Sequence, residues 1–335
     1  MGARHGSRDL AVTVGAGVIA VSAWAGSIGM ATGLLPLQPA LTGRLPFRSP
    51  VLAGAALAVV VGLPTTLAAV LSARGHPRSR DVAALAGVTL VGWIAVEAAV
   101  VRLFSPLQPV CAAAGMGLAA LGSRAVVRQV VDVVAALPLF VSAPLLRPWH
   151  LRWGAAPTEV AAPMPADDLV PRSHFTATRA ITIDAPPEEV WPWLAQVGFG
   201  RAGFYSYDLL DNLARPSAST VLPQWQQVTV GALAAPMADP PTTATSFVVE
   251  DVDAPRTLVW AKPDSTWCWS LRPEADGRTR LVTRIRQQYR LRPSTLLTVV
   301  LAEVGDFAMM RRMLIGIKQR AECTPSRSMT LAARS

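Results

Sequence analysis

The sequence predicts an all-α transmembrane helix bundle followed by an α+β domain, in which a curved antiparallel sheet grips a long C-terminal helix. Three observations predict this division. Long apolar segments fill the first 104 residues. Before residue 147 the acidic residues are only Asp9, Asp81, Glu97 and Asp132, whereas the rest of the chain has ordinary soluble composition. Alternating strand patterns then occupy the C-terminal half, which ends in a stripe with the period of a helix.

The apolar segments Leu10–Leu37, Pro50–Leu71 and Val82–Phe104 each reach the ~20 residues that a helix needs to cross a bilayer. We expect a fourth span at Leu107–Gly122, which is shorter but rich in the small residues that let helices pack closely in lipid. The first segment is longer than the apolar part of a cleaved signal peptide, so we expect a retained helix. Residues 1–146 are therefore predicted to be a transmembrane region of about four helices.

A fifth apolar segment, Val130–Leu146, decides on which side of the membrane the C-terminal domain lies. It contains Asp132 and is interrupted by Pro138 and Pro144, and a proline removes a backbone donor from a helix. We therefore expect an interfacial or re-entrant helix. With four crossings the loop arginines gather on the side of the N-terminus, which predicts a cell-membrane protein with a cytoplasmic C-terminal domain. A fifth crossing would place that domain outside.

Composition and motifs exclude several functions. The net charge of +9 does not indicate nucleic-acid binding, because much of it is loop arginine beside apolar helices. The three cysteines, Cys111, Cys268 and Cys323, and the four histidines have no metal-site spacing. The sequence also lacks a P-loop, a zinc-protease motif and a nucleophile elbow. We therefore expect no metal, no cofactor and no catalytic residues, so an enzyme is less favoured than a binding protein.

Residues 147–171 are predicted to join the two halves as a juxtamembrane segment and linker. The segment begins with Arg147-Pro-Trp-His-Leu-Arg-Trp-Gly154, and its tryptophans and arginines suit the headgroup level of a membrane. Ala155–Pro171 is rich in Pro, Ala and Asp, which is typical of a linker.

Residues 172–322 have the length of one domain with its own core. Phe175–Ile183 ends in alternating apolar residues and predicts a strand. Pro187 and Glu188 then suit the first turn of a helix that reaches Val197. The elements expected next are a short helix at Phe204–Leu213 and strands at Ser246–Val252, Arg256–Ala261, Thr266–Leu271 and Arg280–Leu291.

The last strand and the last helix predict how the sheet is covered. Alternation in Arg280–Leu291 predicts one protected face and one wet face, with Arg284 and Arg286 on the wet side. A long helix is expected at Ser294–Glu322, with Ser294 as its N-cap. Its apolar stripe, expected to pack on the concave sheet, comprises Leu297, Val300, Val304, Phe307, Ala308 and Leu314. Residues 323–335 are expected to be a disordered tail.

Two segments carry a resemblance to a known family: Arg179-Ala-Ile-Thr-Ile-Asp-Ala-Pro-Pro-Glu-Glu-Val-Trp-Pro-Trp-Leu194 and Gly200-Arg-Ala-Gly-Phe-Tyr-Ser-Tyr-Asp-Leu-Leu-Asp-Asn212. They resemble the START/polyketide cyclase-like (SRPBCC) superfamily, in particular bacterial members with a Gly-Arg-x-Gly-Phe-Tyr-Ser-Tyr-Asp element. The resemblance covers roughly residues 147–322 and not the membrane half. It implies a helix-grip fold with an apolar cavity, in a superfamily that binds lipids, sterols, polyketides or other hydrophobic molecules. Some members are cyclases or hydrolases.

The ligand-binding residues are expected around this cavity. Tyr205, Tyr207 and Asp208 are expected near its mouth; alternatively, the tyrosines pack under the sheet edge and Asp208 pairs with Arg201. Four tryptophans are expected either as an aromatic wall or as ordinary core: Trp225, Trp260, Trp267 and Trp269. Because successive strand residues point to opposite faces, the last two should face inward and Cys268 outward.

These observations favour a membrane-tethered START-like domain that binds a hydrophobic small molecule or a lipid, surrounded by membrane lipids and without a nucleic-acid partner. Two alternatives stay open. One is a polyketide cyclase/aromatase-like enzyme with Tyr205, Tyr207 and Asp208 as acid–base groups. The other is a regulatory partner of another membrane protein that holds no ligand.

Overall fold

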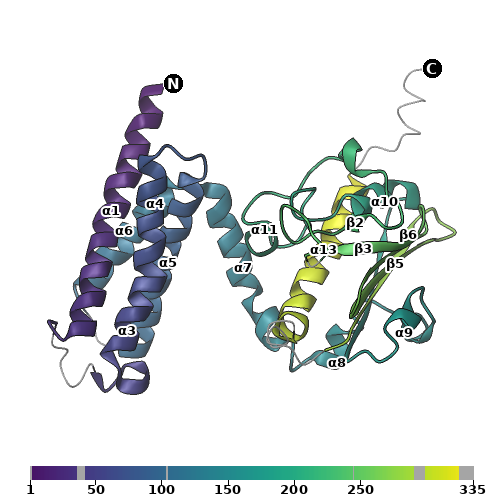
Figure 1. The fold of residues 1–335 in the computed structure, drawn as a ribbon, viewed down its shortest axis with the longest axis horizontal. Helices are drawn as coiled ribbons and strands as arrows, with labels where there is room; N and C mark the ends of the chain where they lie inside the picture. The colour runs from purple at the N-terminus through teal and green to yellow at the C-terminus, as the bar shows by residue number, and fades with distance from the viewer. Residues whose placement is uncertain (1, 36–41, 103–104, 244, 290–298, 324–335) are drawn as a thin grey trace. The chain divides into compact units, whose positions relative to one another are not determined.

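The computed structural model describes residues 2–35, 42–102, 105–243, 245–289 and 299–323. The chain divides into two compact units, Met1–Val131 and Asp132–Ser335 (Figure 1). The first consists of helices and the second is an α+β domain, as the sequence predicts. The expected N-cap Ser294, the stripe residue Leu297 and nearly all of the expected tail lie outside the described residues.

The helices of the first unit follow the apolar segments. Where the second apolar segment lies, a π-helical turn, η2 (Ala58–Gly62), joins two α-helices into one continuous stretch. The helices are α1 (Gly2–Thr32), α3 (Pro50–Leu57), α4 (Leu63–Ala73), α5 (Ser79–Val101), α6 (Leu107–Leu121) and α7 (Arg124–Ser142), the last of which continues into the second unit.

Within the described residues, four helical stretches are long and apolar enough to cross a membrane: Asp9–Thr32, Pro50–Ala73, Ser79–Val101 and Arg124–Ser142. The first three match the predicted spans. The fourth is not the expected one, because α6 has 15 residues and reaches only about 22 Å of a hydrocarbon core of ~30 Å. The last stretch is α7, in which Pro138 is accommodated inside the helix instead of interrupting it.

Small residues let α5 and α6 approach closely, and α6 lies in the segment that the sequence predicts to pack closely through its small residues. A Cβ on Gly87 would lie 2.5 Å from the backbone nitrogen of Ala119, and one on Gly115 would lie 2.8 Å from the carbonyl oxygen of Gly87. Only glycine fits at such distances, so the two backbones touch directly.

The second unit is built on one antiparallel sheet of six strands, in the order β1-β6-β5-β4-β3-β2. The long C-terminal helix α13 (Asp306–Glu322) packs against β1 and against α10 (Pro187–Ala195). This arrangement confirms the helix-grip fold. The strands are β1 (Phe175–Ile183), β2 (Leu233–Ala234), β3 (Phe247–Asp253), β4 (Thr257–Lys262), β5 (Ser265–Pro273) and β6 (Thr279–Gln287).

The main core lies between α13 and the face of the sheet that carries the tryptophans. Trp267 and Trp269 belong to this core together with Leu314 of α13. Cys268, between the two tryptophans, packs in a separate cluster on the opposite face. The alternation of β5 therefore places its bulky residues under the helix.

The buried side of the last helix differs in part from the predicted stripe. Leu314 is buried in the core on the sheet as expected, whereas Phe307 packs on Trp149 and Ala308 on Ala136. Val300 is 46% exposed and Val304 is only partly buried. A π-helical turn, η5 (Leu301–Gly305), precedes α13. Because a π-turn inserts extra chain into the helix, it changes the phase of the apolar stripe at this point. The buried stripe continues instead through Met310, Met313, Ile317 and Ala321.

The second face of the sheet is covered, although the sequence predicts a wet face there. Ala155–Pro171, expected to be a linker, contains α9 (Pro157–Ala161) and a 3-10 turn, η3 (Asp167–Leu169). Its residue Met164 packs on a small apolar cluster of the sheet, formed by Ala180, Val259, Cys268 and Val282. The domain is therefore a sheet with a cover on each face.

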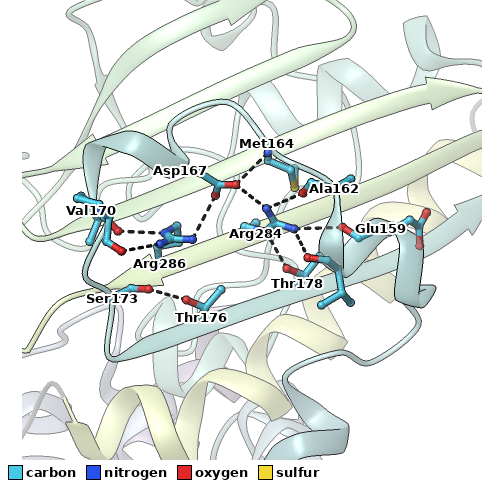
Figure 2. A network of polar contacts seen from close by, with 12 residues as sticks. Glu159, Ala162, Met164, Asp167, Val170, Ser173, Thr176, Thr178, Arg284 and Arg286 are labelled. Atoms are coloured by element: carbon cyan, nitrogen blue, oxygen red, sulfur yellow. Dashed lines mark hydrogen bonds and ion pairs between the residues drawn. The ribbon is translucent and has the colours of Figure 1, made fainter.

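Arg284, expected to be solvated, is only 4% exposed and attaches this cover to the sheet (Figure 2). Its guanidinium pairs with Asp167 at 2.6 Å, and its Nε donates to the Thr178 hydroxyl at 2.8 Å. Arg286 also approaches Asp167 and donates to the carbonyl oxygen of Val170 at 3.0 Å. A buried guanidinium is stable only when its donors are satisfied, so the covering segment is required by the arginines beneath it.

We expect Asp167→Asn to lower the free energy of unfolding by about 1.5–3 kcal/mol, because it removes a charged partner from a buried guanidinium. Denaturant unfolding of the full-length protein in detergent, followed by tryptophan fluorescence, measures the change. The matched control is Asp168→Asn, since Asp168 is the next residue and is exposed. Equal losses in the two variants would contradict the role of Asp167.

Candidate functional site

The second unit contains a cavity of about 210 Å³ at the β2 edge of the sheet. We call it the edge cavity. On one side it is bounded by side chains of β3 and β4. On the other side it is bounded by the chain segment that leads from the 3-10 turn η4 (Pro223–Trp225) to β2. Its lining includes Arg201, Trp225, Val228, Val249, Leu258 and Trp260.

The floor of the edge cavity is apolar and tightly packed. Val249, Leu258 and Trp260 come from β3 and β4, and each is at most 2% exposed. Trp260 makes edge-to-face contacts with Trp267 and Trp269, with ring centroids 5.2 and 5.7 Å apart. The floor is therefore one surface of a packed tryptophan cluster, in the edge-to-face arrangement that aromatic pairs prefer.

Polar side chains line part of this space, namely Arg201, Gln224 and Gln227. The Arg201 guanidinium lies 4.5 Å from the ring centre of Trp225 and donates to the carbonyl oxygen of Leu233 at 2.7 Å. Burial lowers the pKa of Arg201 from its ordinary value. The Trp260 indole nitrogen is buried and has no hydrogen-bond partner among the described residues. A cation therefore lies beside an aromatic floor, which suits an apolar ligand with an acceptor or anionic group.

Trp267 and Trp269 do not line the edge cavity. Their ring centroids are 5.0 Å apart, and they fill the core between the sheet and α13. The Trp267 indole nitrogen donates to the Thr283 hydroxyl at 3.0 Å. Of the four expected tryptophans, the structure thus places Trp225 and Trp260 at the cavity and the other two in the core.

Tyr205 lies away from the edge cavity and ties α10 to α13. Its hydroxyl donates to the carbonyl oxygen of Trp193 at 3.0 Å and accepts from Gln196 at 2.9 Å. The Arg320 guanidinium lies 4.5 Å from its ring centre. Burial raises the pKa of Tyr205, so this phenol stays protonated at neutral pH.

Tyr207 and Asp208 are also used elsewhere. The Tyr207 ring packs on Phe140 of α7, with centroids 5.8 Å apart. Asp208 accepts from the backbone nitrogen of Ser217 at 2.9 Å and from the Ser217 hydroxyl. Asp208 therefore closes a loop, and the ion pair considered for it with Arg201 does not form.

Arg201 lines the edge cavity, whereas the sequence suggested it only as a possible ion-pair partner of Asp208. The signal for its location lies in the turn that carries it. Gly198 and Gly203 form an isolated β-bridge, and Gly198 has φ 137°. A Cβ on Gly198 would lie 2.4 Å from Pro236, so glycine is needed for the turn to approach the chain beside β2. This close approach brings Arg201 to Leu233.

No group of three or more histidine, cysteine, aspartate or glutamate residues in the described part of the chain could hold a metal ion. Among the described residues of the chain, the carboxyl with a pKa raised into the neutral range is that of Asp211, in α11 (Asp208–Asp211). Burial, together with the nearby Asp208 carboxylate, raises the pKa of Asp211 to about 7. It is not among the residues that line the edge cavity.

No family model matches the chain, and no curated protein matches it. Two solved structures are similar to it. Protein MLL2253 from Mesorhizobium loti, a crystal structure, is 19% identical with a TM-score of 0.27, over 45% of this chain and 99% of that one. The Polyketide_cyc-like protein Cgl2372 from Corynebacterium glutamicum, a solution NMR structure, is 14% identical with a TM-score of 0.28, over 49% and 96%. The helix-grip assignment rests on the strand order and the C-terminal helix of this chain.

The raised pKa of Asp211 predicts a pH dependence of stability. The folded protein keeps a proton on Asp211 up to about pH 7, whereas an unfolded chain releases it near pH ~4. Stability should therefore fall as the pH rises between these values. We expect Asp211→Asn, which cannot ionise, to raise the melting temperature at pH 8 more than at pH 5. Asp253→Asn, at an exposed position, is the control; identical pH profiles for wild type and Asp211→Asn would refute the shift.

Proposed function

We propose that the C-terminal unit binds a small apolar or aromatic molecule that carries an anionic or acceptor group. The observation that supports this most is the edge cavity, where the cation of Arg201 stacks on Trp225 beside an aromatic floor that includes Trp260. An aromatic surface supplies hydrophobic contact area. The Arg201 guanidinium fixes the orientation of a ligand, which is how a polar group acts in a binding pocket.

The size of the cavity narrows the class of ligand. Its volume of about 210 Å³ lies below the ~300–1,000 Å³ of pockets for drug-sized molecules. A one-ring or two-ring compound or a short acyl chain is therefore favoured over a whole phospholipid or a sterol. The floor cannot retreat easily, because Trp260 is held by Trp267 and Trp269.

A cyclase-like reaction has less support than binding. The acid–base groups considered for it, Tyr205, Tyr207 and Asp208, do not line the edge cavity. Tyr205 and Asp208 are engaged in hydrogen bonds to neighbouring chain segments. The competing proposal is a regulatory domain whose cavity binds no ligand.

We further propose that the helices tether this unit to the cell membrane, with the unit in the cytoplasm. The second half of α7 supports an interfacial helix, because Ala136 and Phe140 pack with Tyr207 and Asp132 pairs with Arg312 at 2.9 Å. Side chains engaged in this way do not face lipid. The fourth crossing would then be α6, whose short length requires local thinning of the bilayer.

Binding is tested with 1-naphthoate and its neutral analogue 1-naphthylmethanol, titrated by calorimetry into the full-length protein in detergent. We expect the naphthoate to bind about tenfold more tightly, the factor that one hydrogen bond to a charged group supplies. Arg201→Gln should remove this preference, and Trp225→Ala should weaken both compounds.

The matched control is Arg256→Gln, which changes an exposed arginine that does not line the cavity. A melting curve of each variant confirms that it is folded. If the naphthoate does not bind, or binds wild type and Arg201→Gln equally, the proposed site is refuted and the ligand-free alternative is favoured.

A further inference from the structure

A second cavity, of about 560 Å³, lies at one end of the first unit. It is formed where the turn between α4 and α5 meets the connection from α6 to α7. Its lining includes Pro77, Arg80, Asp81, Gly122, Ser123 and Arg124. Its volume falls within the ~300–1,000 Å³ range of small-molecule sites, and it is independent of the edge cavity and of the function proposed for it.

The backbone joins the two sides of this cavity. The Ser123 nitrogen donates to the carbonyl oxygen of Arg80 at 3.0 Å. Gly122 allows the close approach, because a Cβ there would lie 2.5 Å from the backbone nitrogen of Ala84. As a result, Arg80 from the first turn of α5 and Arg124 from the start of α7 line one space.

The charges in this space are incompletely paired. Two arginines and the single carboxylate of Asp81 leave one net positive charge. Among the described residues, neither guanidinium forms an ion pair, and the Nε of Arg80 is buried without a hydrogen-bond partner. A buried donor that lacks an acceptor destabilises the protein, so an anion placed here would satisfy it.

Phosphate is the anion that fits best. A guanidinium matches two phosphate oxygens with two parallel N–H groups. Arg80 lies at the first turn of α5, a helix long and apolar enough to cross a membrane. The polar end of such a helix lies at the level of lipid headgroups, and basic pockets between membrane helices bind these headgroups.

We propose that this cavity binds the phosphate of an anionic lipid headgroup. Arg80 and Arg124 hold the phosphate, and Asp81 accepts a hydrogen bond from a headgroup hydroxyl. Phosphatidylglycerol has both features, since its single negative charge matches the net charge of the cavity and its glycerol supplies hydroxyl donors. Phosphatidylcholine, with no net charge and no hydroxyl, lacks both.

Native mass spectrometry of the full-length protein in a neutral detergent, titrated with dioleoyl phosphatidylglycerol, tests this site. Arg80→Gln and Arg124→Gln should each weaken the lipid adduct about tenfold, as the loss of one charge-assisted interaction implies. Arg124 is exposed, so its variant retains the fold even if Arg80→Gln does not. The same titration with phosphatidylcholine should give no specific adduct.

Arg74→Gln and Arg128→Gln are matched controls, because both residues are exposed and neighbour the cavity in sequence without lining it. Retention of phosphatidylglycerol by these two variants supports the proposal. Equal losses in all four variants would indicate a diffuse basic surface and overturn it. Inorganic phosphate is titrated in parallel: if it binds with the same dependence on Arg80 and Arg124 while the lipid does not, the site serves a soluble phosphate and the lipid assignment is overturned.

Discussion

The burial of a single guanidinium, that of Arg179 on β1, constrains how the C-terminal unit is assembled. Arg179 is 1% exposed, and an unpaired buried charge would cost several kcal/mol. It pairs with Asp306 at the start of α13 at 2.6 Å, and its Nε donates to the carbonyl oxygen of His150 at 2.8 Å. One side chain therefore joins the first strand, the short helix α8 (Arg147–His150) and the C-terminal helix. With α13 held at the β1 edge, the edge cavity is left at the opposite edge of the sheet.

Local patterns predicted the elements, whereas the way the elements cover one another depends on distant residues. β1 begins and ends where the sequence predicts, because alternation and the following prolines are local signals. The cover over Arg284 was not predicted, since its need for Asp167 joins residues more than a hundred positions apart. The stripe of the last helix was predicted only in its second half, because the π-turn before Asp306 changes the helical phase without a signal in the sequence. α6 was predicted as a span because its composition suits lipid, and its 15 residues are fewer than the ~20 that a helix needs to cross a bilayer of ordinary thickness.

The candidate site shows the same division. The sequence suggested both Trp260 and Trp267 as lining residues. Trp260 lines the cavity and Trp267 does not. The difference depends on how bulky side chains from separate strands fill the space, since these two rings pack against each other. Tyr205 adopts φ 55°, a conformation rare for residues other than glycine, and this was not deducible from its neighbours. An ion pair between Asp208 and Arg201 was one of two alternatives that the sequence left open. The hydroxyl and backbone nitrogen of Ser217 engage Asp208 instead, and Arg201 stacks at the edge cavity.

Mass spectrometry of small molecules extracted from the full-length protein is the most direct test of whether the edge cavity carries a ligand. The protein is purified from membranes without added ligands and compared with Ala232→Phe, which places a bulky side chain at a position that lines the cavity. We predict that wild type releases a small apolar compound with an acidic or acceptor group and that the folded variant does not. Release of the same compounds by both proteins, or of none by either, would contradict a binding function for this domain.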